Sequence, residues 1–203
     1  MTQLDERSAP SVPDSAAGGY QLSDRYEAGA RPVLLTGVQA VARFLVEQHA
    51  RDAAAGARTA SLVSGYQGSP LAGLDKTLAG VKALRDKHGM HLEPGLNEEL
   101  GATAVWGSQL ELPGETRKVD GVVGVWYGKG PGVDRSGDVL RHANMYGAHP
   151  RGGAVVLAGD DPGSKSSTVP CVSERSLAAM GIPVLYPRNA AEVISMGLHA
   201  VAL

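Results

Sequence analysis

Three polar, glycine-rich strings along the chain have residue types that suit the binding of a small ligand. They occupy residues 65–70, 128–138 and 159–168, and each directly follows an apolar run that is typical of a buried strand. In a parallel sheet such strings meet at the carboxyl edge, where open α/β folds bind their ligands. We therefore expect the three strings to form one shared binding edge.

A possible catalytic carboxylate lies in Asn97-Glu98-Glu99, where a helix is expected to begin. An ordinary helix start accounts for much of this pattern, since Asn is a good N-cap and first-turn acids complement the helix dipole. Glu99 needs no other explanation. Glu98 precedes an almost uncharged helix, which we expect to be buried, and a carboxylate at the entrance of a buried helix needs a partner.

The sequence lacks several common catalytic motifs. Lys129 is followed by glycine where a P-loop needs Ser or Thr, and no GxGxxG follows a predicted strand. No GxSxG nucleophile elbow occurs. The histidines lack metal-site spacing, and the single cysteine, Cys171, allows no internal disulfide or CxxC motif. We therefore expect no metal site within this chain.

Strand and helix signals alternate along the chain, which favours a parallel sheet between two helical layers. Continuous Val/Leu runs indicate strands buried on both faces; they lie at 61–64, 90–93, 119–127, 154–158 and 182–185. Helices are expected from a capping box at 36–39, from Leu71 to a C-cap at Gly89, from Asn97, near 136–145 and 173–180, and from Asn189. The expected class is a three-layer α/β fold.

Length and composition indicate one cytoplasmic domain. The 203 residues suit a single domain, and 19 basic against 21 acidic residues argue against nucleic acid or an anionic membrane as partner. No run approaches the ~20 apolar residues of a membrane span, and no signal peptide is evident. We interpret 1–19 as a disordered leader and 20–203 as the domain. Its last amphipathic helix stops uncapped at Leu203, which indicates a fragment of a longer protein.

Six strings together resemble the N-terminal part of the long, fused indolepyruvate ferredoxin oxidoreductases, in the thiamine-diphosphate-dependent 2-oxoacid:ferredoxin oxidoreductase family. They are LTGVQA (35–40), SGYQGSP (64–70), PGLNEELGATAVWGSQ (94–109), WYGKGPGVDRSGDVLRHAN (126–144), AGDDPGSKSSTVP (158–170) and IPVLYP (182–187). The resemblance implies a pyrimidine-binding domain, incomplete at its C-terminus. It also implies oxidative decarboxylation of indolepyruvate or related arylpyruvates to acyl-CoA, with electrons passing to ferredoxin, in a homo-oligomer.

The resemblance also assigns site residues. Glu98 matches the glutamate that hydrogen-bonds the aminopyrimidine ring of thiamine diphosphate and favours its imino tautomer, which is general acid–base catalysis relayed through the cofactor. Gly65 and Ser69 match positions near the cofactor, although Gly-Ser-Pro equally fits a simple turn before a helix. For Lys129, Asp134, Arg135, Lys165 and Ser166 we favour roles in loop structure or subunit contacts.

The chain departs from the full-length family in what it lacks. No GDG segment for Mg²⁺ and diphosphate, no cysteine cluster for [4Fe-4S] centres and no coenzyme A-binding portion is present, and the family carries these further along the polypeptide. We therefore expect the 203 residues alone to be inactive. Two alternatives stay open: a thiamine-dependent decarboxylase or synthase without iron–sulfur chemistry, and a non-enzymatic nucleotide-binding module.

Overall fold

The described part of the chain contains one sheet of four parallel strands. The computed structural model describes residues 21–29, 32–67, 71, 73–113 and 116–203, and the leader expected at 1–19 lies outside them. The strand order is β2-β1-β3-β4, with β1 at Thr59–Gly65, β2 at Met90–Leu92, β3 at Gly121–Gly128 and β4 at Gly153–Ala158. Every neighbouring pair is parallel. These four strands confirm four of the predicted ones.

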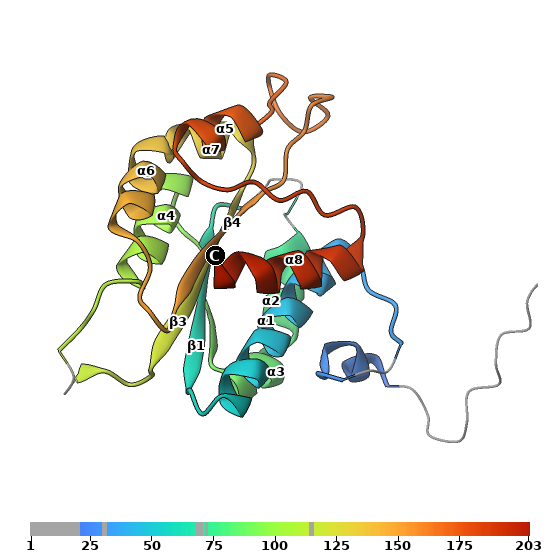
Figure 1. Cartoon of the computed structure of the whole chain (residues 1–203). Helices are drawn as coiled ribbons and strands as arrows, with labels where there is room; N and C mark the ends of the chain where they lie inside the picture. The colour runs from blue at the N-terminus through green and yellow to red at the C-terminus, as the bar shows by residue number, and fades with distance from the viewer. Residues whose placement is uncertain (1–20, 30–31, 68–70, 72, 114–115) are drawn as a thin grey trace, which may run out of the picture.

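Helices cover both faces of the sheet, so the protein is a three-layer α/β fold, as predicted (Figure 1). One face carries α1 (Gly37–Ala54), α2 (Gly73–Gly80), α3 (Lys82–His88) and α8 (Ala190–Ala202). The other carries α4 (Glu98–Gly107), α5 (Gly130–Arg135), α6 (Gly137–Tyr146) and α7 (Glu174–Ala179). A short 3-10 helix, η1 (Leu22–Tyr26), contacts α1.

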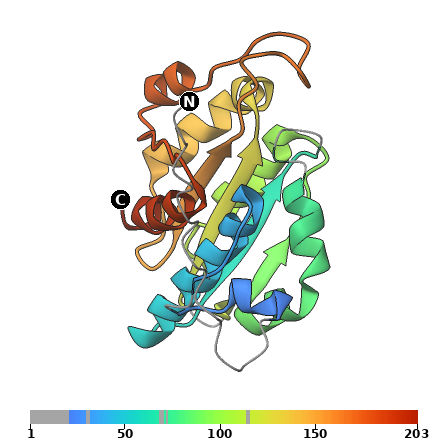
Figure 2. The ribbon, with the colours of Figure 1, turned by 90° about the vertical axis from the view of Figure 1, so that its right-hand side faces the viewer.

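Each face of the sheet has its own apolar core, because the side chains of β3 alternate between the two. Val125 and Tyr127 point into the core beneath α1 and α8, the two helices that lie across this face in Figure 2. Trp126 points the opposite way, into the core formed with α4, α5, α6 and α7. All three side chains are fully buried. A strand buried on both faces explains the unbroken apolar run that predicted β3.

Side-chain caps fix the starts of three helices where the sequence predicted them. The Thr36 hydroxyl accepts from the backbone N–H of Gln39 at 3.3 Å, and the Gln39 side chain accepts from the Thr36 N–H at 3.0 Å. Asn97 and Asn189 cap α4 and α8 by accepting from the backbone N–H three residues later. These bonds satisfy N–H groups that have no partner inside the helix.

The structure corrects two of the predicted elements. The helix predicted from Leu71 divides into α2 and α3, because the Val81 N–H bonds back to Leu78, three residues earlier, just after the weak helix former Gly80. Gly89 still ends α3 in the left-handed conformation, at φ 61°. The strand predicted at 182–185 is wrong. Pro183 has no N–H for a strand ladder, and this segment carries the chain from α7 on one face to α8 on the other.

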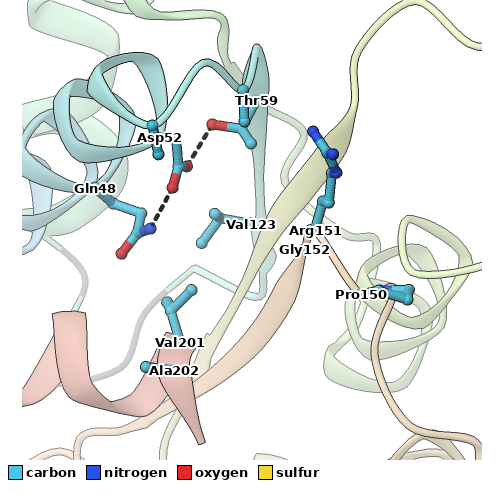
Figure 3. Close-up of a pocket in the computed structure, with 11 residues that line it drawn as sticks. Gln48, Asp52, Thr59, Val123, Pro150, Arg151, Gly152, Val201 and Ala202 are labelled. Atoms are coloured by element: carbon cyan, nitrogen blue, oxygen red, sulfur yellow. Dashed lines mark hydrogen bonds between the residues drawn. The ribbon is translucent and has the colours of Figure 1, made fainter.

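A series of partly buried hydrogen bonds joins α1 to β1. It lies beside a cavity of about 330 Å³, which Gln48, Asp52 and Thr59 help to line (Figure 3). The Thr59 hydroxyl donates to Asp52 at 2.5 Å, so its oxygen accepts from Nδ1–H of His49 at 2.8 Å. Nε2 of His49 then accepts from the Ser61 hydroxyl at 2.5 Å. These hydrogen bonds therefore hold His49 neutral in one tautomer. Burial lowers the pKa of its imidazole from 6.5 to about 4.

We expect this histidine to make the protein less stable in acid. The unfolded chain binds a proton at His49 below pH 6.5 and the folded chain does not until about pH 4. The stabilisation is therefore complete above pH 6.5 and is lost as the pH falls toward 4, by roughly 3 kcal/mol. Urea unfolding at pH 7 and pH 4.5 measures it. His49→Gln should remove this part of the pH dependence, and His91→Gln, at an exposed position, should keep it. Equal pH dependence in all three proteins contradicts the account.

Candidate functional site

The carboxyl edge of the sheet brings together the strings that the sequence singled out. Because the strands are parallel, β1, β3 and β4 end at the same edge of the sheet, at Gly65, Gly128 and Ala158. Gly65 pairs with Tyr127, and Gly128 pairs with Ala158. Helix α4 begins near this edge and packs against both β1 and β3. Most of the string at 128–138 is helical, because α5 and the start of α6 occupy it. Pro131 suits the first turn of α5.

Glu98 lies in the first turn of α4 and is half-buried, whereas Glu99 is exposed. The Glu98 side chain lies against Gly132 of α5. A Cβ at position 132 would be 2.7 Å from Cγ and 3.3 Å from Oε1 of Glu98. Among the residues that the structure describes, none donates a hydrogen bond to the Glu98 carboxylate. The carboxylate therefore retains its capacity to accept hydrogen bonds.

Glycines allow α4 to approach the end of β1 closely enough to place Glu98 at this edge. A Cβ on Gly101 would lie 3.0 Å from both the Cα and the N of Gly65. A Cβ on Gly65 would lie 2.1 Å from the carbonyl oxygen of Tyr127 in β3. The backbone of Gly65 therefore lies against Gly101, which is three residues after Glu98 in α4. Ser69, the third residue assigned to the cofactor, lies outside the described residues.

Helix α4 is only half buried, which corrects the expectation that its apolar sequence makes it a buried helix. Gly101, Ala102 and Val105 face the core, but Leu100 is 49% exposed. The helix is apolar on its solvent side as well as on its packed side. Because α4 is exposed on one side, Glu98 in its first turn is half-buried.

The other residues of the glycine-rich strings are held by hydrogen bonds within the 159–168 string and by bonds from it and from α7 to residues 129 and 134. Asp161 accepts from the backbone N–H groups of Ser166 at 2.5 Å and Lys165 at 3.1 Å, which lower the pKa of its carboxyl. The Lys129 ammonium donates to the carbonyl of Ser166. Asp134 accepts from the Ser176 hydroxyl at 3.3 Å. These contacts fit the structural roles that we favour for these residues.

Sequence reasoning missed a buried pair near the same edge. The Tyr127 hydroxyl at the end of β3 donates to the Asp75 carboxylate on α2, and both side chains are buried. Burial, together with this bond to Asp75, raises the pKa of the tyrosine hydroxyl. The bond ties α2 to the sheet. The sequence offers one signal, the acidic Asp75 in a leucine-rich helix, but its partner Tyr127 is 52 residues away along the chain.

Two cavities of the described structure do not include Glu98 in their lining. A groove of about 1530 Å³ runs along the unpaired edge of β4 and beneath the 181–187 segment, and its lining includes neither Glu98 nor Gly65. The smaller cavity of Figure 3 lies where β1 begins, at the opposite edge of the sheet.

Comparison of the chain with protein-family models, with curated proteins and with solved structures gave no match. Within the described ranges, no three His, Cys, Asp or Glu side chains gather where they could hold a metal ion. The helices of that same part of the chain are all too short or too polar to cross a bilayer. The fold and the site geometry define an α/β protein with a parallel sheet and a half-buried glutamate near its carboxyl edge.

Proposed function

We propose that this chain is the pyrimidine-binding part of a cytoplasmic, thiamine-diphosphate-dependent 2-oxoacid:ferredoxin oxidoreductase that acts on indolepyruvate or related arylpyruvates. The observation that supports the proposal is the Glu98 carboxylate, which lies near the carboxyl edge of a parallel sheet without a donor from the described residues. That edge is where open α/β sheets bind ligands. The six strings that resemble the family place its glutamate at this same residue.

The residues around Glu98 fit an aminopyrimidine. The carboxylate accepts hydrogen bonds, as a protonated ring nitrogen requires, and its half-buried position strengthens such a bond relative to one in water. Gly132 presents no side chain beside it, so the Glu98 side chain can occupy space that a Cβ would fill. When bound, thiamine diphosphate supplies the carbon nucleophile that oxidative decarboxylation of a 2-oxo acid requires.

Each residue of this chain then has a limited task. Glu98 holds a proton at the ring nitrogen and so sets the tautomer of the ring, a contribution of the acid–base kind. Gly65 and Gly101 let α4 approach β1 and so place Glu98 at the edge. Ser69 is a hydrogen-bonding contact in this proposal. The diphosphate, Mg²⁺, the [4Fe-4S] clusters and coenzyme A would be bound by the remainder of a longer, homo-oligomeric enzyme, which passes its electrons to ferredoxin.

The isolated chain can test the pyrimidine assignment without the rest of the enzyme. We expect it to bind 4-amino-5-hydroxymethyl-2-methylpyrimidine, the pyrimidine half of thiamine, with shifts of the Glu98 and Leu100 amide resonances in NMR titrations. Glu98→Gln should abolish these shifts, because the amide cannot replace the carboxylate as acceptor of a charged hydrogen bond. Glu99→Gln, whose side chain is exposed, should bind like the wild type.

Two results would contradict the proposal: no binding by the wild-type chain, or equal binding by the Glu98→Gln variant. Tight binding of an adenine nucleotide, unaffected by Glu98→Gln, would favour a nucleotide-binding module instead.

A further inference from the structure

We propose that Trp126 and Gly132 are the positioning residues that aim the Glu98 carboxylate. This inference rests on the proposed function and names two residues outside α4 that determine where the Glu98 carboxylate lies. Trp126 acts on the backbone of Glu98, and Gly132 acts on its side chain.

Trp126 ties the first turn of α4 to the sheet. Its indole Nε1–H donates to the backbone carbonyl of Glu98 at 2.9 Å, across 28 positions of sequence. The indole is fully buried in the core with Ala102 and Val105 of the same helix. Gly128 leaves room for it, because a Cβ there would lie 2.5 Å from the indole Cη2. Since β3 is fixed by strands on both sides, the bond sets the position of the Glu98 backbone relative to the edge of the sheet.

Gly132 determines the direction of the Glu98 side chain. It lies in α5, where alanine would be the better helix former. Its missing side chain leaves the space that Cγ of Glu98 occupies, since a Cβ would approach that atom to 2.7 Å. Helix propensity therefore opposes glycine at position 132, and the contact with the Glu98 side chain explains why a glycine fits there.

Removing the indole N–H should weaken pyrimidine binding without removing the carboxylate. In the 203-residue chain we expect Trp126→Phe to bind 4-amino-5-hydroxymethyl-2-methylpyrimidine about fivefold more weakly, the effect of one lost hydrogen bond. The amide protons of Leu100 and Gly101, which bond to Asn97 in the first turn, should also exchange faster with solvent. Trp106→Phe is the matched control, because the Trp106 Nε1 has no hydrogen-bond partner among the described residues.

Gly132→Ala tests the second half of the proposal independently of the indole. The added methyl must displace the Glu98 side chain, so we expect binding of the same pyrimidine to weaken at least about tenfold. Exchange at Leu100 and Gly101 should stay at the wild-type rate, because the Trp126 bond is intact. This variant also provides the test if Trp126→Phe does not fold.

The outcomes separate this inference from the proposed function. If wild-type binds the pyrimidine and Glu98→Gln does not, while Trp126→Phe and Gly132→Ala both bind as tightly as wild-type, the inference alone is overturned. A lowered melting temperature in Trp126→Phe with unchanged affinity overturns the role of Trp126, since the residue would then be purely structural. If the wild-type chain does not bind the pyrimidine, the proposed function fails and the inference fails with it.

Discussion

The proposed function predicts that replacing Glu98 by glutamine, in a longer enzyme that contains this chain, lowers arylpyruvate-dependent ferredoxin reduction by about 10²–10⁴-fold, the usual contribution of a positioned acid or base. The amide keeps the size of the side chain and loses the charge that holds a proton on the ring nitrogen. The fold should be unaffected, because no described residue donates a hydrogen bond to this carboxylate. Initial rates of ferredoxin reduction with saturating arylpyruvate measure the effect.

Glu99→Gln is the control for this substitution, because Glu99 is the next residue of the same helical turn and its side chain points to solvent. We expect it to keep near wild-type turnover. Wild-type turnover in both variants would show that Glu98 does not participate in catalysis. Equal losses in both variants would indicate an effect on the helix start instead of on one carboxylate.

Replacing Gly65 by alanine is expected to have the largest effect on stability. The new Cβ would lie 2.1 Å from the carbonyl oxygen of Tyr127, and a backbone atom cannot turn aside as a flexible side chain can. The ends of β1 and β3 would have to separate at this point. We expect a loss of roughly 3 kcal/mol in the free energy of unfolding, at the upper end of overpacking effects, measured by urea denaturation.

Gly107→Ala supplies the comparison, since a Cβ there meets nothing within 4 Å and the residue lies in α4. Alanine favours helix over glycine by about 1 kcal/mol, so this variant should be as stable as the wild type or more stable. If Gly65→Ala unfolds at the same urea concentration as Gly107→Ala, the close contact between Gly65 of β1 and Tyr127 of β3 is contradicted.

Local sequence signals predicted the parts of the fold that depend on neighbours along the chain. Thr36 and Gln39 form their capping box within four residues, and Asn97 caps α4 in the same way. The apolar run before Gly128 predicted a strand buried on both faces. In each case the deciding interactions lie within one turn or one strand, so the sequence contains them.

The features that the sequence did not predict depend on distant contacts. The 182–185 run has the composition of a strand, but it forms no strand and crosses from α7 to α8 without pairing with β4. The partners of Glu98 are also distant in sequence: the indole N–H of Trp126 and the space beside Gly132. From sequence alone, a tryptophan within a strand, such as Trp126, predicts a core residue, and a glycine in a glycine-rich string, such as Gly132, predicts a turn. Only the folded arrangement shows that both residues contact Glu98.

The central claim is that the Glu98 carboxylate binds a pyrimidine ring nitrogen, and nitrogen NMR measures that contact directly. The probe is 4-amino-5-hydroxymethyl-2-methylpyrimidine labelled with ¹⁵N at both ring positions, titrated with the wild-type chain and with Glu98→Gln. We expect one of the two ring resonances to move on binding to the wild type, as hydrogen bonding to a carboxylate requires, and to stay in place with the variant. A complex in which neither ring nitrogen responds, or in which the variant gives the same shift, would contradict the claim.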